Sequence, residues 1–239
     1  MDETTWSITI PSAPPAWVTM MTGVIALLAA TSAVTSRASV FRKAMFGFTV
    51  LSTIVHEAGH GIASIVTGGG VHFIEIHSPD AGRTWTWYPT WFSSVVTTAA
   101  GYAAPPLVGL GFASLLARGK APMVLALTAV AMALIVIVCR DVVTVASVIT
   151  VGGLAFAVVR WGSVDVQHWV AFTETWLLLL CEIAGLWAIV KNRLRRSGQV
   201  EDDARTLALD THIPAAVWIA AWAALNFWIL WKAVPLLWP

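Results

Sequence analysis

The sequence predicts an all-α polytopic membrane protein with about seven transmembrane helices and one short β-hairpin. Two features of the composition support this fold class: 58% of the 239 residues are hydrophobic and only 11% are charged, with a mean hydropathy of +0.77. Soluble domains carry about 25% charged residues. The third feature is a series of apolar runs of about 20 residues, the length that a helix needs to cross a hydrocarbon core about 30 Å thick. We therefore expect a single integral membrane domain over residues 1–239.

The predicted spans follow the apolar runs in chain order. Five runs contain no Asp, Glu, Lys or Arg, and the second and sixth runs contain ionisable residues. The seven predicted spans are residues 16–36, 44–67, 91–117, 121–139, 142–159, 169–190 and 213–231. Because Asp2 and Glu3 make the N-terminus acidic rather than basic, we expect the first span to be a retained anchor and not a cleaved signal peptide.

Two segments between the spans have patterns of their own. Residues 71–88 alternate apolar and polar side chains around Pro79 and Gly82, which is typical of a β-hairpin. Residues 191–210 are polar, and we expect a loop there. The 14 Lys and Arg residues divide evenly between the two sides of the membrane, so their number gives no orientation. The density of basic residues in the 191–210 segment places that side in the cytoplasm.

The charge balance and the cysteines exclude several classes of function. A formal net charge of +1 leaves no basic excess to neutralise a phosphate backbone, so we expect no nucleic-acid partner. Cys139 and Cys181 both lie in apolar runs, which excludes a disulfide framework and a cysteine zinc site. The expected environment is the lipid bilayer.

The most informative residues are His56-Glu57-Ala58-Gly59-His60, an H-E-x-x-H pattern inside the second predicted span. On a helix both imidazoles point from one face toward one Zn²⁺, while Glu57 flanks the open coordination position. A third protein ligand and a water complete such a site, in which the pKa of the water falls to about 7 and Glu57 can pass its proton to a leaving amine. Ionisable groups inside a span cost several kcal/mol unless they pair, bind a metal or line a wet cavity. The pattern therefore predicts a peptidase site with one Zn²⁺ per chain, in preference to a structural polar cluster.

The chain resembles the site-2 protease family of intramembrane zinc metalloproteases, and in particular the small bacterial members that lack a PDZ domain. The resemblance rests on the zinc motif, the Gly-rich hairpin that follows it, and Ala100-Gly101-Tyr102 with Pro105 and Pro106. The C-terminal segment around residues 203–218 is also similar to the tail of that branch. The resemblance implies a multi-pass protein of the bacterial cytoplasmic membrane that cleaves the transmembrane helix of a protein substrate within the bilayer.

The third zinc ligand remains open between two aspartates. The family typically supplies an Asp, and an acidic ligand is favoured beside two neutral histidines in a medium of low dielectric constant. We expect Asp203, which lies in the tail segment, although a helix N-cap is its alternative role. Asp141 is the second candidate, and its alternative role is an ion pair with the adjacent Arg140. Both aspartates fall on the predicted cytoplasmic side.

The hairpin is a candidate substrate-binding element. An unpaired strand edge inside the membrane must face protein or water, and there it can pair with an extended substrate backbone. On this interpretation Val71, Phe73, Trp85 and Trp87 contact the substrate. The alternative is a hairpin that is anchored at the membrane interface by its tryptophans.

Other readings of the sequence have less support. Glu174 and Glu182, eight residues apart in the sixth span, can line a water path, but we expect the first to be interfacial and the second to pair within the bundle, with neither in the site. A non-catalytic membrane subunit, which uses the metal site for structure or to bind a partner in a membrane complex, is the main alternative function. Glu57 argues against it, because a structural zinc site does not need that carboxylate.

Overall fold

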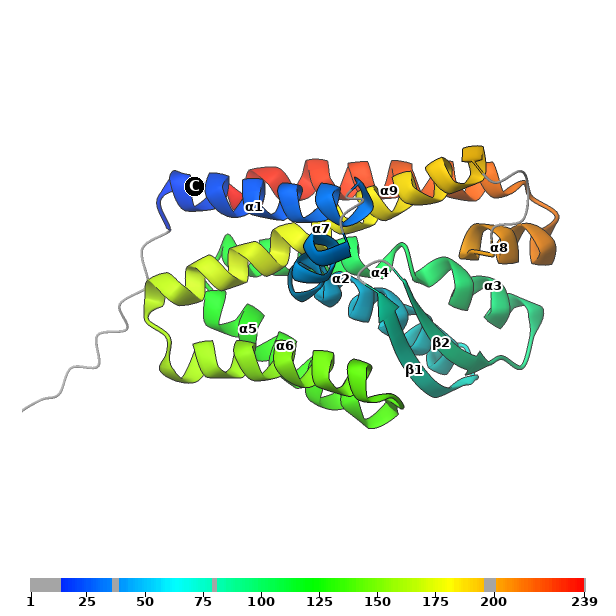
Figure 1. Cartoon of the computed structure of the whole chain (residues 1–239), viewed down its shortest axis with the longest axis horizontal. Coiled ribbons are helices and arrows are strands. Elements are labelled where there is room, and N and C mark those ends of the chain that lie inside the picture. Colours follow the sequence, from blue (N-terminus) through cyan, green and yellow to red (C-terminus); the bar gives the residue numbers. More distant parts are fainter. Residues whose placement is uncertain (1–13, 36–38, 79–80, 196–200, 239) are drawn as a thin grey trace, which may run out of the picture.

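The structure, a computed structural model, describes residues 14–35, 39–78, 81–195 and 201–238, and this part of the chain is mostly helical (Figure 1). The acidic N-terminus and residues 79 and 80 of the expected hairpin turn lie outside the described residues. The elements are α1 (Ala16–Thr35), α2 (Ser39–Val66), β1 (Gly70–Ser78), β2 (Ala81–Trp87), α3 (Trp91–Ala100), α4 (Ala104–Leu116), α5 (Ala121–Ile135), the 3₁₀ helix η1 (Val136–Val138), α6 (Val142–Trp161), α7 (Val164–Arg195), α8 (Asp203–Thr211) and α9 (Ala215–Leu237).

Four helical segments in the described part of the chain are long and apolar enough to cross a membrane. They are α5 continued by η1, α6, α7 and α9, and the number rises to five if α3 and α4 together form one broken span. The prediction of a helical membrane protein is thus confirmed, but the number of seven spans is not. Neither α1 nor α2 is among these segments, and the apolar part of α1 is the shorter stretch Ala16–Ser32.

The prediction of one continuous span over residues 91–117 is wrong, because α3 and α4 are bent by 56° at the break between them. Pro105 and Pro106 explain the break. A proline inside a helix lacks the N–H that the ladder needs, and its ring collides with the carbonyl four residues earlier. Both prolines are accommodated instead in the first turn of a new helix, α4. The break brings the backbone around Gly101 toward α2.

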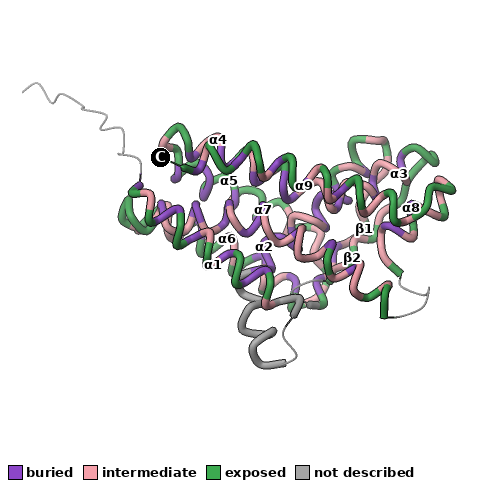
Figure 2. Tube along the Cα trace, turned by 90° about the horizontal axis from the view of Figure 1, so that it is seen from above, coloured by how far each residue is buried: buried purple, intermediate pink, exposed green. Residues whose placement is uncertain are grey.

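The helices pack in a bundle whose buried positions face one another (Figure 2). The helices α1, α7 and α9 run side by side, α4 packs on α7 and α9, and the α5–α6 pair packs on the other side of α7 (Figure 1). Small residues of α1 such as Ala26 and Ala29 form a buried cluster with Leu177 of α7. Small side chains let two helices approach closely, which is how helices associate in lipid.

The predicted hairpin at residues 71–88 is confirmed as an antiparallel pair of strands, β1 and β2. The outer edge of β1 is tied to the start of α6, because Ile74 forms a bridge with Cys139 and the Ile76 N–H donates to Thr144 Oγ1 at 2.6 Å. Both strands contact α2, and β2 contains Thr84, which bonds to Glu57 of that helix. The hairpin is therefore fixed on one side and presents β2 to the helix that carries the H-E-x-x-H motif.

The prediction of a loop over residues 191–210 is wrong for its described parts, since α7 continues to Arg195 and residues 203–211 form α8. Asp202 begins α8 as its N-cap, and its carboxylate accepts a hydrogen bond from the Arg205 N–H at 2.9 Å. Ala204 and Leu207 are buried and form a cluster with Trp222 of α9. The segment has a polar composition because only one face of this short helix is buried.

Candidate metal centre

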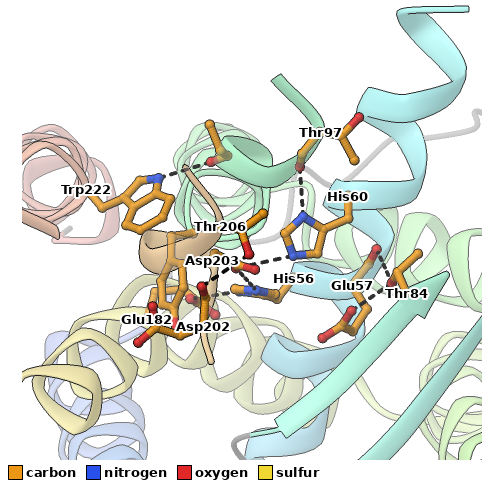
Figure 3. Close-up of polar contacts among 12 residues, drawn as sticks. His56, Glu57, His60, Thr84, Thr97, Glu182, Asp202, Asp203, Thr206 and Trp222 are labelled. Carbon is orange, nitrogen blue, oxygen red and sulfur yellow. Dashed lines mark hydrogen bonds and ion pairs between the residues drawn. The ribbon is translucent and has the colours of Figure 1, made fainter. Parts of the chain in front are cut away.

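Three side chains from two distant segments meet at one point: His56 and His60 of α2 and Asp203 at the start of α8 (Figure 3). Their ligand atoms all lie within 4.8 Å of one another. Asp203 Oδ2 is 3.3 Å from His56 Nε2 and 3.4 Å from His60 Nε2. The two residues of the motif and the expected third residue thus lie together, although 143 positions separate His60 from Asp203 in the sequence.

Hydrogen bonds to the other ring nitrogens fix the orientation of both imidazoles. His60 Nδ1 is 2.8 Å from the main-chain oxygen of Thr97, which can only accept, so Nδ1 carries the proton. His56 Nδ1 is likewise 3.2 Å from the carboxylate oxygen Oε2 of Glu182. In the neutral form, each imidazole therefore directs the lone pair of its Nε2 toward Asp203. Two lone pairs that face one carboxylate oxygen repel it, and either a metal ion bound between the three groups or protonation of the imidazoles removes this repulsion.

The distances from Asp203 to the two histidines are those expected around a tetrahedral metal ion. Two donor atoms that are each about 2.0–2.1 Å from Zn²⁺ lie about 3.3–3.5 Å apart at a tetrahedral angle, close to the distances from Asp203 to the two Nε2 atoms. Gly101 also favours a metal ion at this point. A Cβ atom at this position would lie 2.5 Å from His56 Nε2 and 2.6 Å from His60 Nε2. The absence of a side chain there leaves the two nitrogens accessible.

The position of Asp203 follows from the way α8 begins. The N-cap of α8 is Asp202, and not Asp203, for which the sequence analysis gave this as the alternative role. Asp202 also forms an ion pair with Arg193 at the end of α7. Asp203, one residue later, is left to face the two histidines. Burial by itself would raise the pKa of Asp203, but His60 and His56 in their protonated form outweigh it and hold this pKa below its usual range.

The other end of α8 is attached to α3. Ser94 Oγ donates to Asp210 Oδ2 at 2.7 Å, and Trp91 Nε1 donates to the Asp210 main-chain oxygen at 2.7 Å. The short helix is therefore fixed at both ends, by α7 through Arg193 and by α3 through Asp210. These contacts hold a residue from outside the candidate spans against the face of α2.

Glu57 lies beside the three ligand residues and is 5% exposed. Its carboxylate accepts a hydrogen bond from the hydroxyl of Thr84 on β2, with 2.7 Å between Thr84 Oγ1 and Glu57 Oε2 (Figure 3). The main-chain oxygen of Glu57 lies 2.9 Å from the same hydroxyl. A carboxylate in this position can act as a base on a water at the open side of the ligand group.

Glu182 is the functional residue that the sequence reasoning left out of the site. It pairs within the bundle as expected, but its partner is His56, and its second oxygen accepts from Ser52 Oγ at 3.1 Å. Its only signal in the sequence was a carboxylate inside an apolar span. Glu174, which we expected at the interface, is buried and accepts a hydrogen bond from Thr128 of α5 at 2.9 Å.

The structure places Asp141, the alternative third ligand, at the N-cap of α6. Its Oδ1 accepts from the Thr144 N–H at 3.0 Å, and its Oδ2 accepts from the Thr144 hydroxyl. Asp141 is not in the group of ligand atoms formed by the described residues, which is His56, His60 and Asp203. Arg140, the expected partner of Asp141, lies over the ring of Phe73 instead, 4.7 Å from its centroid.

The ligand group opens into a cavity of about 590 Å³. The cavity is lined by β2, by α8 and by the polar face of α2 that includes Thr49, Ser52 and Thr53. The hairpin contributes six lining residues: Ala81, Gly82, Arg83, Thr84, Thr86 and Tyr88.

The four hairpin side chains that we expected to bind substrate do not line this cavity. Trp85 and Trp87 are exposed, Phe73 packs on Trp85 with 5.5 Å between the ring centroids, and Val71 lies against Gly61 of α2. Sequence alternation identified the strands but could not show which of their faces turns toward the histidines.

Comparison with known proteins identifies one family. The family model described as Peptidase M50B-like matches residues 18–233, which is most of the chain. The comparisons with curated proteins and with solved structures gave no match.

Proposed function

The chain belongs to the Peptidase M50B-like family of the site-2 protease type, and from this premise we propose that it is an intramembrane zinc metalloprotease that hydrolyses peptide bonds of membrane-embedded protein substrates. The observation that carries the proposal is the convergence of two imidazoles and one carboxylate on a single point next to a buried glutamate. Family membership indicates the class of reaction, and the side-chain geometry indicates where in the molecule the reaction takes place.

We assign the metal to His56, His60 and Asp203, and the role of general base and acid to Glu57. Zn²⁺, when bound, supplies Lewis-acid activation of a water molecule, whose pKa falls to about 7. Glu57 then accepts a proton from the attacking water and delivers it to the amine that leaves when the C–N bond breaks. A glutamate in this place supports catalysis over a purely structural metal site, which has no use for it.

The remaining parts of the cavity suggest how a substrate is held. A transmembrane helix hides its carbonyl groups in its own hydrogen bonds, so a protease must bind its backbone in an extended form. We assign this task to the hairpin, because six of its residues between Ala81 and Tyr88, among them Gly82, Thr84 and Thr86, line the cavity. Main-chain pairing with a strand is a common way to bind an extended peptide. The face that carries Trp85 and Trp87, which points away from the cavity, then anchors the hairpin at the membrane surface.

The substrate class follows from the surroundings of the site. We place the face of α2 that carries the motif inside the membrane, next to the candidate spans, and α8 on the cytoplasmic side. The partners are then a transmembrane protein substrate and the lipid bilayer of a bacterial cytoplasmic membrane.

The test combines zinc content with cleavage in proteoliposomes. The purified wild-type chain should hold about one zinc and cleave a fluorescently labelled single-span peptide that carries a central glycine pair. His56→Ala should lose both properties, and Glu57→Gln should keep the zinc and lose cleavage. His77→Ala, which removes an exposed histidine outside the ligand group, should keep its zinc. A wild type without zinc, or cleavage that survives in Glu57→Gln, would refute the proposed function.

A further inference from the structure

The strand β2 touches the carboxylate of Glu57 at both of its oxygens. Thr84 lies 2.7 Å from Oε2 through its hydroxyl. Gly82, two residues earlier on the same face of the strand, lies next to Oε1, and a Cβ atom at this position would be 2.7 Å from both Oε1 and the Cγ of Glu57. One oxygen is thus held by a donor, and the other has space only because the facing residue is glycine.

The two contacts make the two oxygens of Glu57 different. The Thr84 hydroxyl has a single proton, which it shares between Glu57 Oε2 and the Glu57 main-chain oxygen at 2.9 Å. Hydrogen bonds to a charged acceptor are stronger than those between neutral groups, so the carboxylate is the preferred partner. Oε2 is therefore engaged, and Oε1 is left as the oxygen that can accept a proton.

We propose that Thr84 is a positioning residue that holds the Glu57 carboxylate in its working orientation, and that Gly82 provides the space this orientation needs. The inference rests on the proposed function and adds to it a role for the hairpin in the chemical step. The same strand lines the cavity in which the substrate is expected, so the substrate-binding surface and the general base are joined by one hydrogen bond. A long glutamate side chain has several rotamers, and a fixed donor reduces the entropy lost when the base must be in one place.

A purely structural role for Thr84 predicts something different. If its hydroxyl only fastened the hairpin to α2, its loss would weaken folding and substrate binding together. A positioning role predicts a lower kcat with an unchanged KM, because the fixed carboxylate matters in the transition state and not in the binding of the substrate.

The variants that separate these roles are Thr84→Val, Thr84→Ser and Gly82→Ala, all purified in the full chain. Thr84→Val keeps the shape of the side chain and loses the donor, Thr84→Ser keeps the donor, and Gly82→Ala places a methyl group against Oε1. Thr150→Val is the matched control, since Thr150 is exposed and, among the described residues, its hydroxyl bonds to its own helix at the Ala146 main-chain oxygen.

Two readouts are measured on each variant. The first is kcat and KM for the single-span peptide in proteoliposomes. General-base catalysis contributes about 10²–10⁴-fold in rate, and we expect Thr84→Val and Gly82→Ala to lower kcat by about 10–100-fold with KM within twofold. Thr84→Ser should stay within about threefold of the wild type in kcat, and Thr150→Val should match it. All four variants should keep about one zinc per chain.

The second readout needs no substrate. Acetohydroxamate binds a zinc ion and donates a hydrogen bond to a neighbouring carboxylate, so its affinity for the zinc-loaded protein reports where that carboxylate lies. Loss of one hydrogen bond to a charged group is worth about a tenfold change in affinity. We expect Thr84→Val to bind acetohydroxamate about tenfold more weakly than wild type, and Thr84→Ser to bind it equally well.

The outcomes separate this inference from the proposed function. A wild type that binds zinc and cleaves nothing would count against the proposed function, while the hydroxamate comparison would still decide the role of Thr84. If Thr84→Val retained wild-type kcat and hydroxamate affinity, the positioning role would be wrong. It would also be wrong if Thr84→Ser were as damaged as Thr84→Val, because the serine hydroxyl supplies the same donor.

Discussion

Glu182→Gln should weaken zinc binding by about 10–100-fold while the three ligands remain intact. Glu182 Oε2 is 3.2 Å from His56 Nδ1, and its Oε1 accepts a hydrogen bond from Ser52. The side chain of Glu182 is 8% exposed, so water does not replace what it gives to the histidine. A carboxylate on the outer nitrogen of a metal-bound histidine fixes the ring and raises its basicity, and its loss typically costs 10–100-fold in metal affinity. This corresponds to about 1.4–2.7 kcal/mol.

Glutamine is the appropriate replacement because it isolates the charge. Its side-chain oxygen can still accept from the His56 ring, so the geometry is kept while the negative charge is lost. Glu174→Gln is the matched control. Glu174 is also a buried carboxylate of α7, but it accepts from Thr128 and does not contact the ligand group. Its replacement should leave zinc affinity unchanged.

The assay is competition for zinc between the detergent-purified protein and a chromogenic chelator. The expected order of affinity is wild type equal to Glu174→Gln, and both tighter than Glu182→Gln. Equal affinity in Glu182→Gln and wild type would refute the role of Glu182. An equal loss in Glu174→Gln would show that any change of charge in α7 disturbs the bundle, and would remove the support for a specific contact.

Three further predictions concern the ligand group and α8. Asp203→Asn should lose zinc by elemental analysis, whereas Asp141→Asn should keep it. Asp141→Ala should lower the free energy of unfolding by about 0.5–2 kcal/mol, because the N-cap of α6 is lost. Gly101→Ala should abolish zinc binding, because its methyl group would lie within 2.6 Å of both Nε2 atoms, and Gly111→Ala, which meets nothing within 4 Å, should bind normally in the same measurement. Asp202→Ala should weaken zinc affinity by about fivefold in chelator competition, because losing the N-cap of α8 costs about 1 kcal/mol of the helix that carries the third ligand.

The zinc motif could be read from the sequence because its spacing is local. The positions i and i+4 lie on one face of any helix, whatever packs around it, so His56 and His60 needed no knowledge of the fold. Asp203 was reached by a different route, namely the resemblance of the tail to one branch of the family. Its choice over Asp141 had no geometric basis in the sequence, since both aspartates were placed on the same side of the membrane.

The residues that sequence reasoning missed are those whose role depends on contacts between distant segments. Glu182 lies 126 positions from His56, and its pattern within α7 does not distinguish it from Glu174. Gly101 is one of 17 glycines, and only the break between α3 and α4 brings it to the histidines. Average hydropathy did not reveal that break, because the 91–117 run contains no charged residue and a window average does not respond to two prolines.

The break between α3 and α4 leaves main-chain oxygens without their usual helical partners, and α9 supplies new ones. Trp222 Nε1 donates to the Ala99 oxygen at 3.0 Å, and Asn226 Nδ2 donates to the Tyr102 oxygen at 3.2 Å. Buried main-chain groups without a hydrogen-bond partner are costly, and these two side chains satisfy two of the oxygens at the break. They thereby hold Gly101 against the two imidazoles.

The ligand group also joins α8 to α2, in addition to the contacts that attach α8 to α7, α3 and α9. Asp203 approaches α2 from a helix of nine residues, too short to be stable by itself. A metal that binds His56, His60 and Asp203 at once would fasten α8 to α2, so part of its binding free energy would appear as stability of that helix. Without a metal, the Asp203 carboxylate faces two nitrogen lone pairs, and the same contact is repulsive unless the imidazoles are protonated. Metal binding would therefore strengthen the attachment of α8 to α2, on which the position of the third ligand depends.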